Sequence, residues 1–142
     1  MRNIKIETLV EESSMKNFLG NILPRILPEG ICFNQNCFIR THEGKQHLKK
    51  EIPNKIRAYR HSRIPVKVII IQDQDSDDCK ILKARLKQLV DDSGPIPNLI
   101  RIACRELEAW YLGDLEAIQM IYPHFKGNYY HLIRGIQFFL EN

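Results

Sequence analysis

The segment from Val66 to Asp78 constrains the fold of this 142-residue chain more than any other part of its sequence. It reads VKVIIIQDQDSDD, a nearly unbroken β-branched run that ends in four aspartates. Such a run predicts a strand that is buried on both faces, as in a parallel sheet covered by helices. Ligand sites in these sheets lie beyond the carboxyl ends of the strands, so the aspartates fall where an α/β fold places its chemistry.

Two roles are open to these aspartates. Carboxylates this close together repel one another unless a cation neutralises them, and hard oxygen ligands suit Mg²⁺, Mn²⁺ or Ca²⁺. One or two of the aspartates could instead cap the next helix, because Asp in a first turn complements the helix dipole. The spacing of Asp73, Asp75 and Asp77 matches a calcium loop, but Asp78 and Ala84 replace its glycine and closing glutamate. The pattern therefore favours a divalent-metal site and excludes an EF-hand.

The bulk composition predicts one cytoplasmic globular domain. Apolar residues make up 44% of the chain and charged residues 27%, and no apolar run approaches the length of a membrane span. The four cysteines and five histidines show no zinc spacing, so we expect reduced and mostly buried thiols.

Strand and helix patterns alternate along the chain. Strands are predicted at Ile4–Val10, Ile31–Arg40, Val66–Gln72 and Asn98–Cys104, each followed by a helical pattern. Ser13 or Ser14 is expected to cap the first helix, and Pro24 and Pro53 to kink or end the helices that contain them. The order predicts an α/β fold, with a mostly parallel four-stranded sheet flanked by helices in a Rossmann-like arrangement.

We expect this α/β domain to occupy residues 1–126, with the apolar segment 127–142 packed on it as a short helix. Asp77 or Asp78 is expected to begin the helix that follows the third strand.

Further acidic residues could join the aspartates. Glu11 ends the first strand, and parallel strands converge at one sheet edge, so Glu11 can face Asp73 and Asp75. Glu106 and Glu108 follow the fourth strand, but they are two apart on a helix, so only one can easily join the site.

A basic block runs from Arg40 to Lys67, with nine lysines and arginines against two glutamates. It could bind a phosphate backbone or could simply be a solvated helix face. Next to a divalent-metal site, the first interpretation gains weight. The residues that we expect to contact DNA or RNA are Lys49, Lys50, Arg57 and Arg60. Lys45 could neutralise a phosphate or merely begin a helix, and His42 could assist proton transfer, although a surface or capping role is favoured.

Glu11 ends the first predicted strand, and Asp73-x-Asp75 ends the third. This placement of acidic residues resembles that in the Toprim domain of topoisomerases, primases and overcoming-lysogenization-defect nucleases. The chain more closely resembles a Toprim-like family, domain of unknown function 4276. The segments that carry this resemblance are Leu9–Met15, His42–Lys45, Asp73–Cys79 and Arg101–Trp110.

The resemblance implies metal-dependent phosphoryl transfer. Glu11, Asp73 and Asp75 would be the catalytic residues, and together with Asp77 they would hold Mg²⁺ or Mn²⁺. Asp78, Glu106, Glu108 and Lys45 are secondary candidates. The implied function is a nuclease subunit that acts on DNA or RNA, associated with phage defence and an AAA/ABC-type ATPase. The alternative is an inactive Toprim-like binding or regulatory subunit.

The sequence departs from the resemblance in two places. Glu12 stands where a glycine often follows the Toprim glutamate, and residues 127–142 look like a divergent or truncated ending. We therefore expect the chain alone to be a slow or inactive nuclease and to associate with itself or with an ATPase through exposed apolar surface.

Overall fold

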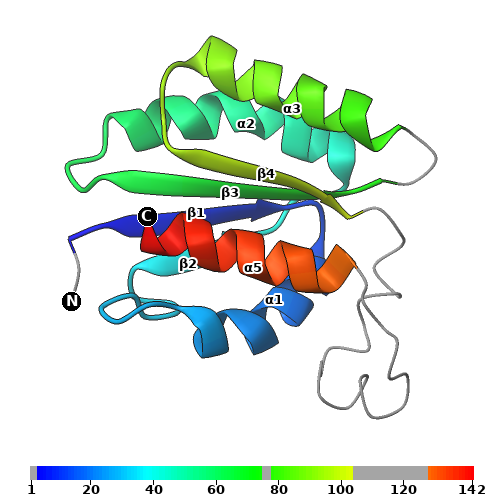
Figure 1. The fold of residues 1–142 in the computed structure, drawn as a ribbon. Coiled ribbons are helices and arrows are strands. Elements are labelled where there is room, and N and C mark those ends of the chain that lie inside the picture. Colours follow the sequence, from blue (N-terminus) through cyan, green and yellow to red (C-terminus); the bar gives the residue numbers. More distant parts are fainter. Residues whose placement is uncertain (1–2, 75–77, 104–127) are drawn as a thin grey trace, which may run out of the picture.

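The computed structural model describes residues 3–74, 78–103 and 128–142 (Figure 1). Strands and helices alternate along these residues, as the sequence pattern predicts. The elements are β1 (Lys5–Val10), α1 (Ser13–Ile26), β2 (Cys37–Arg40), α2 (Lys45–Arg60), β3 (Val66–Asp73), α3 (Cys79–Ser93), β4 (Asn98–Ala103) and α5 (Asn128–Glu141).

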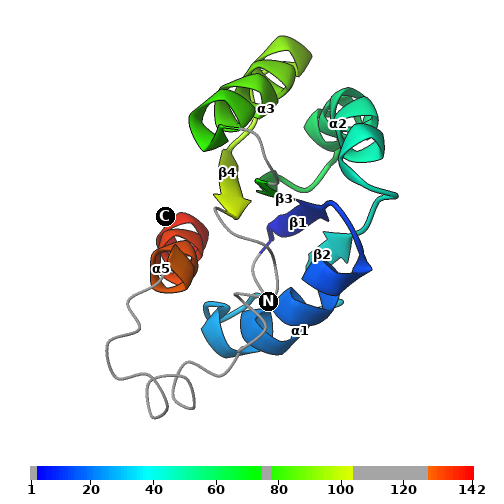
Figure 2. The ribbon, with the colours of Figure 1, turned by 90° about the vertical axis from the view of Figure 1, so that its right-hand side faces the viewer.

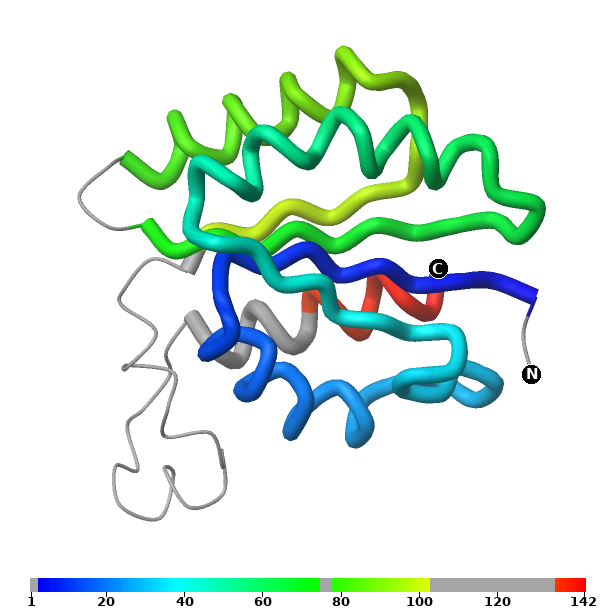
Figure 3. The backbone as a smooth tube through the Cα atoms, turned by 180° about the vertical axis from the view of Figure 1, so that it is seen from behind, coloured from blue at the N-terminus to red at the C-terminus, as the bar shows by residue number. Residues whose placement is uncertain are grey.

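The four strands form one parallel sheet in the order β2-β1-β3-β4. Helices α2 and α3 cover one face, and α1 and α5 cover the other (Figures 1 and 2). Figure 3 shows the same layers from behind, with α2 and α3 on one side of the sheet and α1 on the other. The predicted α/β class and four-stranded parallel sheet are confirmed.

Each face of the sheet has its own apolar core. Alternate residues of β3 divide between them, with Ile69 and Ile71 facing α1 and α5 and Val68 and Ile70 facing α2 and α3. All four side chains are fully buried, which explains why the β3 sequence is apolar without alternation.

Both helical prolines lie inside continuous helices, so neither proline ends its helix, and the expected division into two short helices at Pro53 is wrong. Pro24 lies in α1 and Pro53 in α2. A proline inside a helix costs about 3 kcal/mol. In α2, the neighbouring Ile52 and Ile56 are completely buried, and burial of each contributes about 1.5–3 kcal/mol, which offsets that cost.

The second strand is shorter than the predicted Ile31–Arg40, because the residues before Cys37 form a turn. The side chain of Asn36 accepts a hydrogen bond from the Cys32 amide at 2.6 Å and donates one to the Gly30 carbonyl at 2.9 Å. Asn34 has a φ of 64°, a left-handed conformation that Asn tolerates. Polar side chains therefore divert this segment from the sheet.

The N-cap of α1 lies before both residues that were expected to be the cap, so the predicted capping by Ser13 or Ser14 is wrong. Glu12 occupies the N-cap position and Ser13 and Ser14 are helical, with no side-chain capping bond at this end. Ser14 Oγ instead donates to Glu12 Oε1 at 3.3 Å.

A buried carboxylate lies between β1 and α2. The Glu7 side chain is 1% exposed and accepts hydrogen bonds from Arg40 Nε at 2.8 Å and Arg40 Nη2 at 3.1 Å. Lys5 Nζ lies 3.2 Å from the same carboxylate, and the Tyr59 hydroxyl donates to it at 3.4 Å. The hydrogen bonds and charge of Glu7 raise the pKa of Arg40, and burial together with Glu7 raises the pKa of Tyr59.

The chain ends in the packed helix that the apolar tail predicts, now defined as α5. Ile136 and Leu140 are buried in the core beneath α1 and α5, whereas Phe138 is 70% exposed. Lys67 Nζ donates to the Phe139 carbonyl at 2.9 Å and so ties α5 to β3. In the described ranges, none of the helices combines the length and the apolar character needed to cross a membrane.

Candidate functional site

The strand order defines where a ligand site belongs. The chain moves from β1 outward to β2, then crosses back to β3 on the other side of β1. In open parallel sheets of this order, the topological switch point lies between β1 and β3, and ligands bind beyond the carboxyl ends of those two strands. Here those ends are Val10 and Asp73.

Glu11 and Asp73 meet at this switch point. The Asp73 backbone amide donates a hydrogen bond to Glu11 Oε2 at 3.2 Å, although the two residues are 62 positions apart in the chain. The contact follows from the register, in which the last β1–β3 pair is Val10 and Ile71. The two acidic residues that the sequence analysis assigned to one sheet edge therefore lie side by side, whereas Asp75, Asp77, Glu106 and Glu108 lie outside the described residues.

Asp78 serves as the cap of α3. Its Oδ1 accepts hydrogen bonds from the Lys80 amide at 2.8 Å and the Ile81 amide at 3.1 Å, and the residue is exposed. These bonds satisfy two amides that the helix itself leaves unpaired. Of the two roles considered for this aspartate, the structure shows the capping role.

His42 lies beside the switch point and is 7% exposed, so the expected surface or capping histidine is wrong. Its Nδ1 lies 2.7 Å from the Val10 carbonyl oxygen. Because a carbonyl only accepts, Nδ1 carries the proton and Nε2 keeps its lone pair. Nε2 has no hydrogen-bond partner within the described part of the chain.

The charge state of His42 follows from its surroundings. Burial lowers the pKa of His42 below the ordinary histidine range, opposed by the Val10 hydrogen bond. Nearby Lys55 and His47 lower it further, and Glu51 raises it. The ring of His47 stands edge-on to that of His42, with centroids 5.4 Å apart. His42 is therefore a neutral imidazole at neutral pH.

A glycine lets the chain turn from β2 into α2 next to Glu11 and Asp73, which are called the acidic pair below. Gly44 has a φ of 90°, which other residues rarely adopt, and its amide donates to the Glu11 carbonyl at 3.1 Å. Lys45 follows as the first residue of α2, so the start of this helix is fixed against the end of β1.

The chemistry of Glu11 and Asp73 fits a hard divalent cation. Both are carboxylates, and Mg²⁺ commonly binds through one or two carboxylates while it keeps several waters. No group of three or more His, Cys, Asp or Glu side chains arranged to hold a metal occurs in the described ranges. A cation held by these two residues would therefore take its remaining ligands from water, from substrate or from the aspartates that follow β3.

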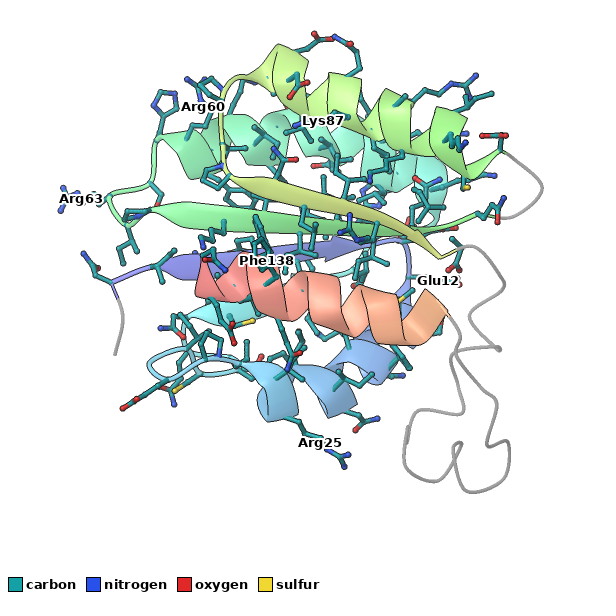
Figure 4. All side chains as sticks on the ribbon, in the orientation of Figure 1. Glu12, Arg25, Arg60, Arg63, Lys87 and Phe138 are labelled. Atoms are coloured by element: carbon teal, nitrogen blue, oxygen red, sulfur yellow. The ribbon has the colours of Figure 1, made fainter. Side chains whose placement is uncertain are left out.

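The predicted nucleic-acid-binding residues are spread along α2. Lys49 and Lys50 lie in the first two turns of α2, near the switch point, whereas Arg57 and Arg60 lie toward its other end. Fifteen steps of about 1.5 Å each place Lys45 and Arg60 about 22 Å apart along the axis. Figure 4 accordingly shows Arg60 and Arg63 at the opposite end of the sheet from Glu12.

The basic face of α3 was not identified from the sequence. Lys80 and Lys83 are exposed near the start of α3, the end that adjoins β3. Helices α2 and α3 pack together on one face of the sheet, and Lys50, Lys80 and Lys83 lie in the first two turns of these helices, the ends nearest the carboxyl edge. The amphipathic pattern of residues 79–93, read for its polar side, would have shown them.

The fold and the positions of Glu11 and Asp73 define the class, an α/β domain with two acidic residues at its switch point. The family model described as Domain of unknown function (DUF4276) matches residues 10–135, and the chain belongs to this family. The match includes Glu11, the β3 strand and its aspartates, and it ends inside α5. Neither the curated proteins nor the solved structures include a match.

Proposed function

We propose that this chain is a metal-dependent phosphoryl-transfer protein, a nuclease subunit that acts on DNA or RNA. The observation that carries the proposal is the contact of Glu11 with the Asp73 amide at the β1–β3 switch point. This is the position at which parallel α/β sheets bind ligands, and carboxylates there suit Mg²⁺ or Mn²⁺.

The acidic residues would have two roles, metal binding and proton transfer. Glu11 and Asp73, with Asp75 and Asp77 from the following segment, would hold the cation. The bound ion would supply charge neutralisation for a phosphate and a lower pKa for an attacking water. Glu11, whose Oε2 accepts a hydrogen bond from the Asp73 amide, would also act as the proton acceptor for the reacting water.

The surroundings support a phosphate substrate. Exposed Lys50, Lys80 and Lys83 flank the edge on which the acidic pair lies. Lysines there would attract a nucleic-acid backbone toward the site, and binding should weaken steeply as salt rises. An ATPase partner, which follows from the resemblance stated above, belongs to the same proposal. So do self-association through apolar surface and a cytoplasmic location, the latter inferred from the composition.

Titration calorimetry with Mn²⁺ tests the metal site without requiring activity. Glu11→Gln and Asp73→Asn should each weaken binding about tenfold or more, because each removes one charge from the ligand set. Asp78→Asn is the matched control, since it removes a nearby charge and asparagine still caps the helix. Equal affinity in wild type and both site variants would refute the assignment.

A cleavage assay on single- and double-stranded DNA and RNA then separates the two functional classes. Cleavage that requires Mg²⁺ or Mn²⁺ and is lost in Glu11→Gln supports a nuclease. Metal binding and ATPase association without cleavage would identify the binding or regulatory subunit instead.

A further inference from the structure

Gln72 is a polar residue at a core position of β3, immediately before Asp73 of the acidic pair. It is completely buried and pairs in register with Ile102 of β4. Two and four residues earlier, Ile70 and Val68 lie in the core under α2 and α3. Because strand side chains alternate, Gln72 faces the same helices and occupies a place where another isoleucine or valine would extend the core.

The amide of Gln72 has no partner within the fold as described. Both Oε1 and Nε2 are buried and make no hydrogen bond to any part of the chain that the structure describes. Leaving a buried polar group unpaired costs about 1–3 kcal/mol, and few native side chains do so. The fold alone gives no reason for a carboxamide at this position.

The position of Gln72 relative to Glu11 supplies a reason. The amide nitrogen that donates to Glu11 Oε2 at 3.2 Å belongs to the peptide bond between Gln72 and Asp73. Continuing the register one step beyond the Val10–Ile71 pair also places Gln72 level with Glu11 on the neighbouring strand. Adjacent parallel strands lie about 4.8 Å apart, so the two residues are cross-strand neighbours.

We propose that Gln72 positions the water that attacks the phosphate, a role that rests on the function proposed above. Its Oε1 would accept a hydrogen bond from this water, and its Nε2 would donate to a non-bridging phosphate oxygen. A carboxamide can do both because it carries an acceptor and a donor in one planar group. The water oxygen forms a bond to phosphorus, its proton passes to Glu11, and the phosphorus–oxygen ester bond breaks. The departing oxygen takes a proton from solvent.

The test compares Gln72→Met with Thr8→Val. Thr8 Oγ1 is also buried without a partner among the described residues, but Thr8 lies on β1 and its neighbours Ile6 and Val10 face α1 and α5. Both substitutions remove an unpaired polar group at nearly constant volume, so both should keep or raise the melting temperature. Only Gln72→Met should lower kcat, by about 100-fold, with KM changed less than threefold.

Mn²⁺ affinity measured by calorimetry should stay at the wild-type value in Gln72→Met, which separates water positioning from loss of the metal. If wild type cleaves and Gln72→Met cleaves equally fast, the role of Gln72 is overturned and the nuclease proposal stands. A lower melting temperature with unchanged kcat would show that Gln72 has a structural role only and would overturn the inference. Absence of cleavage by wild type on every substrate would overturn both.

Discussion

Replacing Arg40 by methionine should expose how strongly the buried Glu7 carboxylate depends on one partner. Arg40 supplies two of the contacts to Glu7, at 2.8 and 3.1 Å. Removing one member of a buried ion pair costs about 3–5 kcal/mol. The Arg40 side chain is 41% exposed and Lys5 remains 3.2 Å from the carboxylate, so the loss should fall to about 2–3 kcal/mol.

Urea unfolding followed by circular dichroism measures this loss. Domains of this size have free energies of unfolding of about 5–15 kcal/mol, so the variant should remain folded and give a lower midpoint with an unchanged slope. Adding Glu7→Gln to Arg40→Met should recover part of the stability, because the double variant no longer buries a carboxylate that has lost its arginine partner.

A surface ion pair provides the control for Arg40→Met. Lys87 and Asp91 lie 3.3 Å apart on α3 and are both about half exposed, so Lys87→Met should cost about 0.5 kcal/mol or less. If the free energy of unfolding of Arg40→Met lies within about 0.5 kcal/mol of the wild-type value, Arg40 does not stabilise the buried carboxylate and the reasoning fails.

Two further predictions concern His42 and Asp78. Burial lowers the pKa of His42, so the unfolded chain binds a proton in the pH range just below about 6.5 that the folded chain excludes. The free energy of unfolding should therefore keep its full value above about pH 6.5 and decrease below it. Between pH 7 and pH 5, His42→Gln should lose less of this free energy than wild type or the exposed-site control His61→Gln. Parallel urea midpoints for wild type and His42→Gln across this range would contradict the assignment. Asp78→Ala should lower the free energy of unfolding by about 1 kcal/mol by removing the α3 cap, whereas Asp78→Asn should change it little; equal losses would argue against capping.

The sequence was most informative where one physical preference dominated. The β-branched run of β3 and the amphipathic pattern of α3 predicted both elements closely, because burial and helical period acted in the same direction there. At the prolines of α1 and α2 the helix continues where a break was one expectation, since tertiary burial of neighbouring residues outweighed a local preference. The segment before Cys37 was misassigned because the Asn36 side chain stabilises a turn that hydrophobicity alone does not reveal.

The candidate site divides in the same way. Glu11 and Asp73 could be assigned to one edge from sequence, because parallel strands bring their carboxyl ends together. Gln72 could not be assigned to the site, since a glutamine at a strand end is unremarkable until its burial and unpaired amide are known. His42 likewise looked like a surface residue until the β1 carbonyl that fixes its proton was in place.

The sequence by itself determined the alternation of strands and helices, the parallel sheet and the concentration of acid after its most buried strand. These follow from side-chain periodicity and burial, which act over a few residues. Only the tertiary structure decided the strand order, the β1–β3 switch point and the contact between Glu11 and the Asp73 amide. These depend on which segments far apart in the chain lie side by side, and preferences that act over a few residues do not specify such partners.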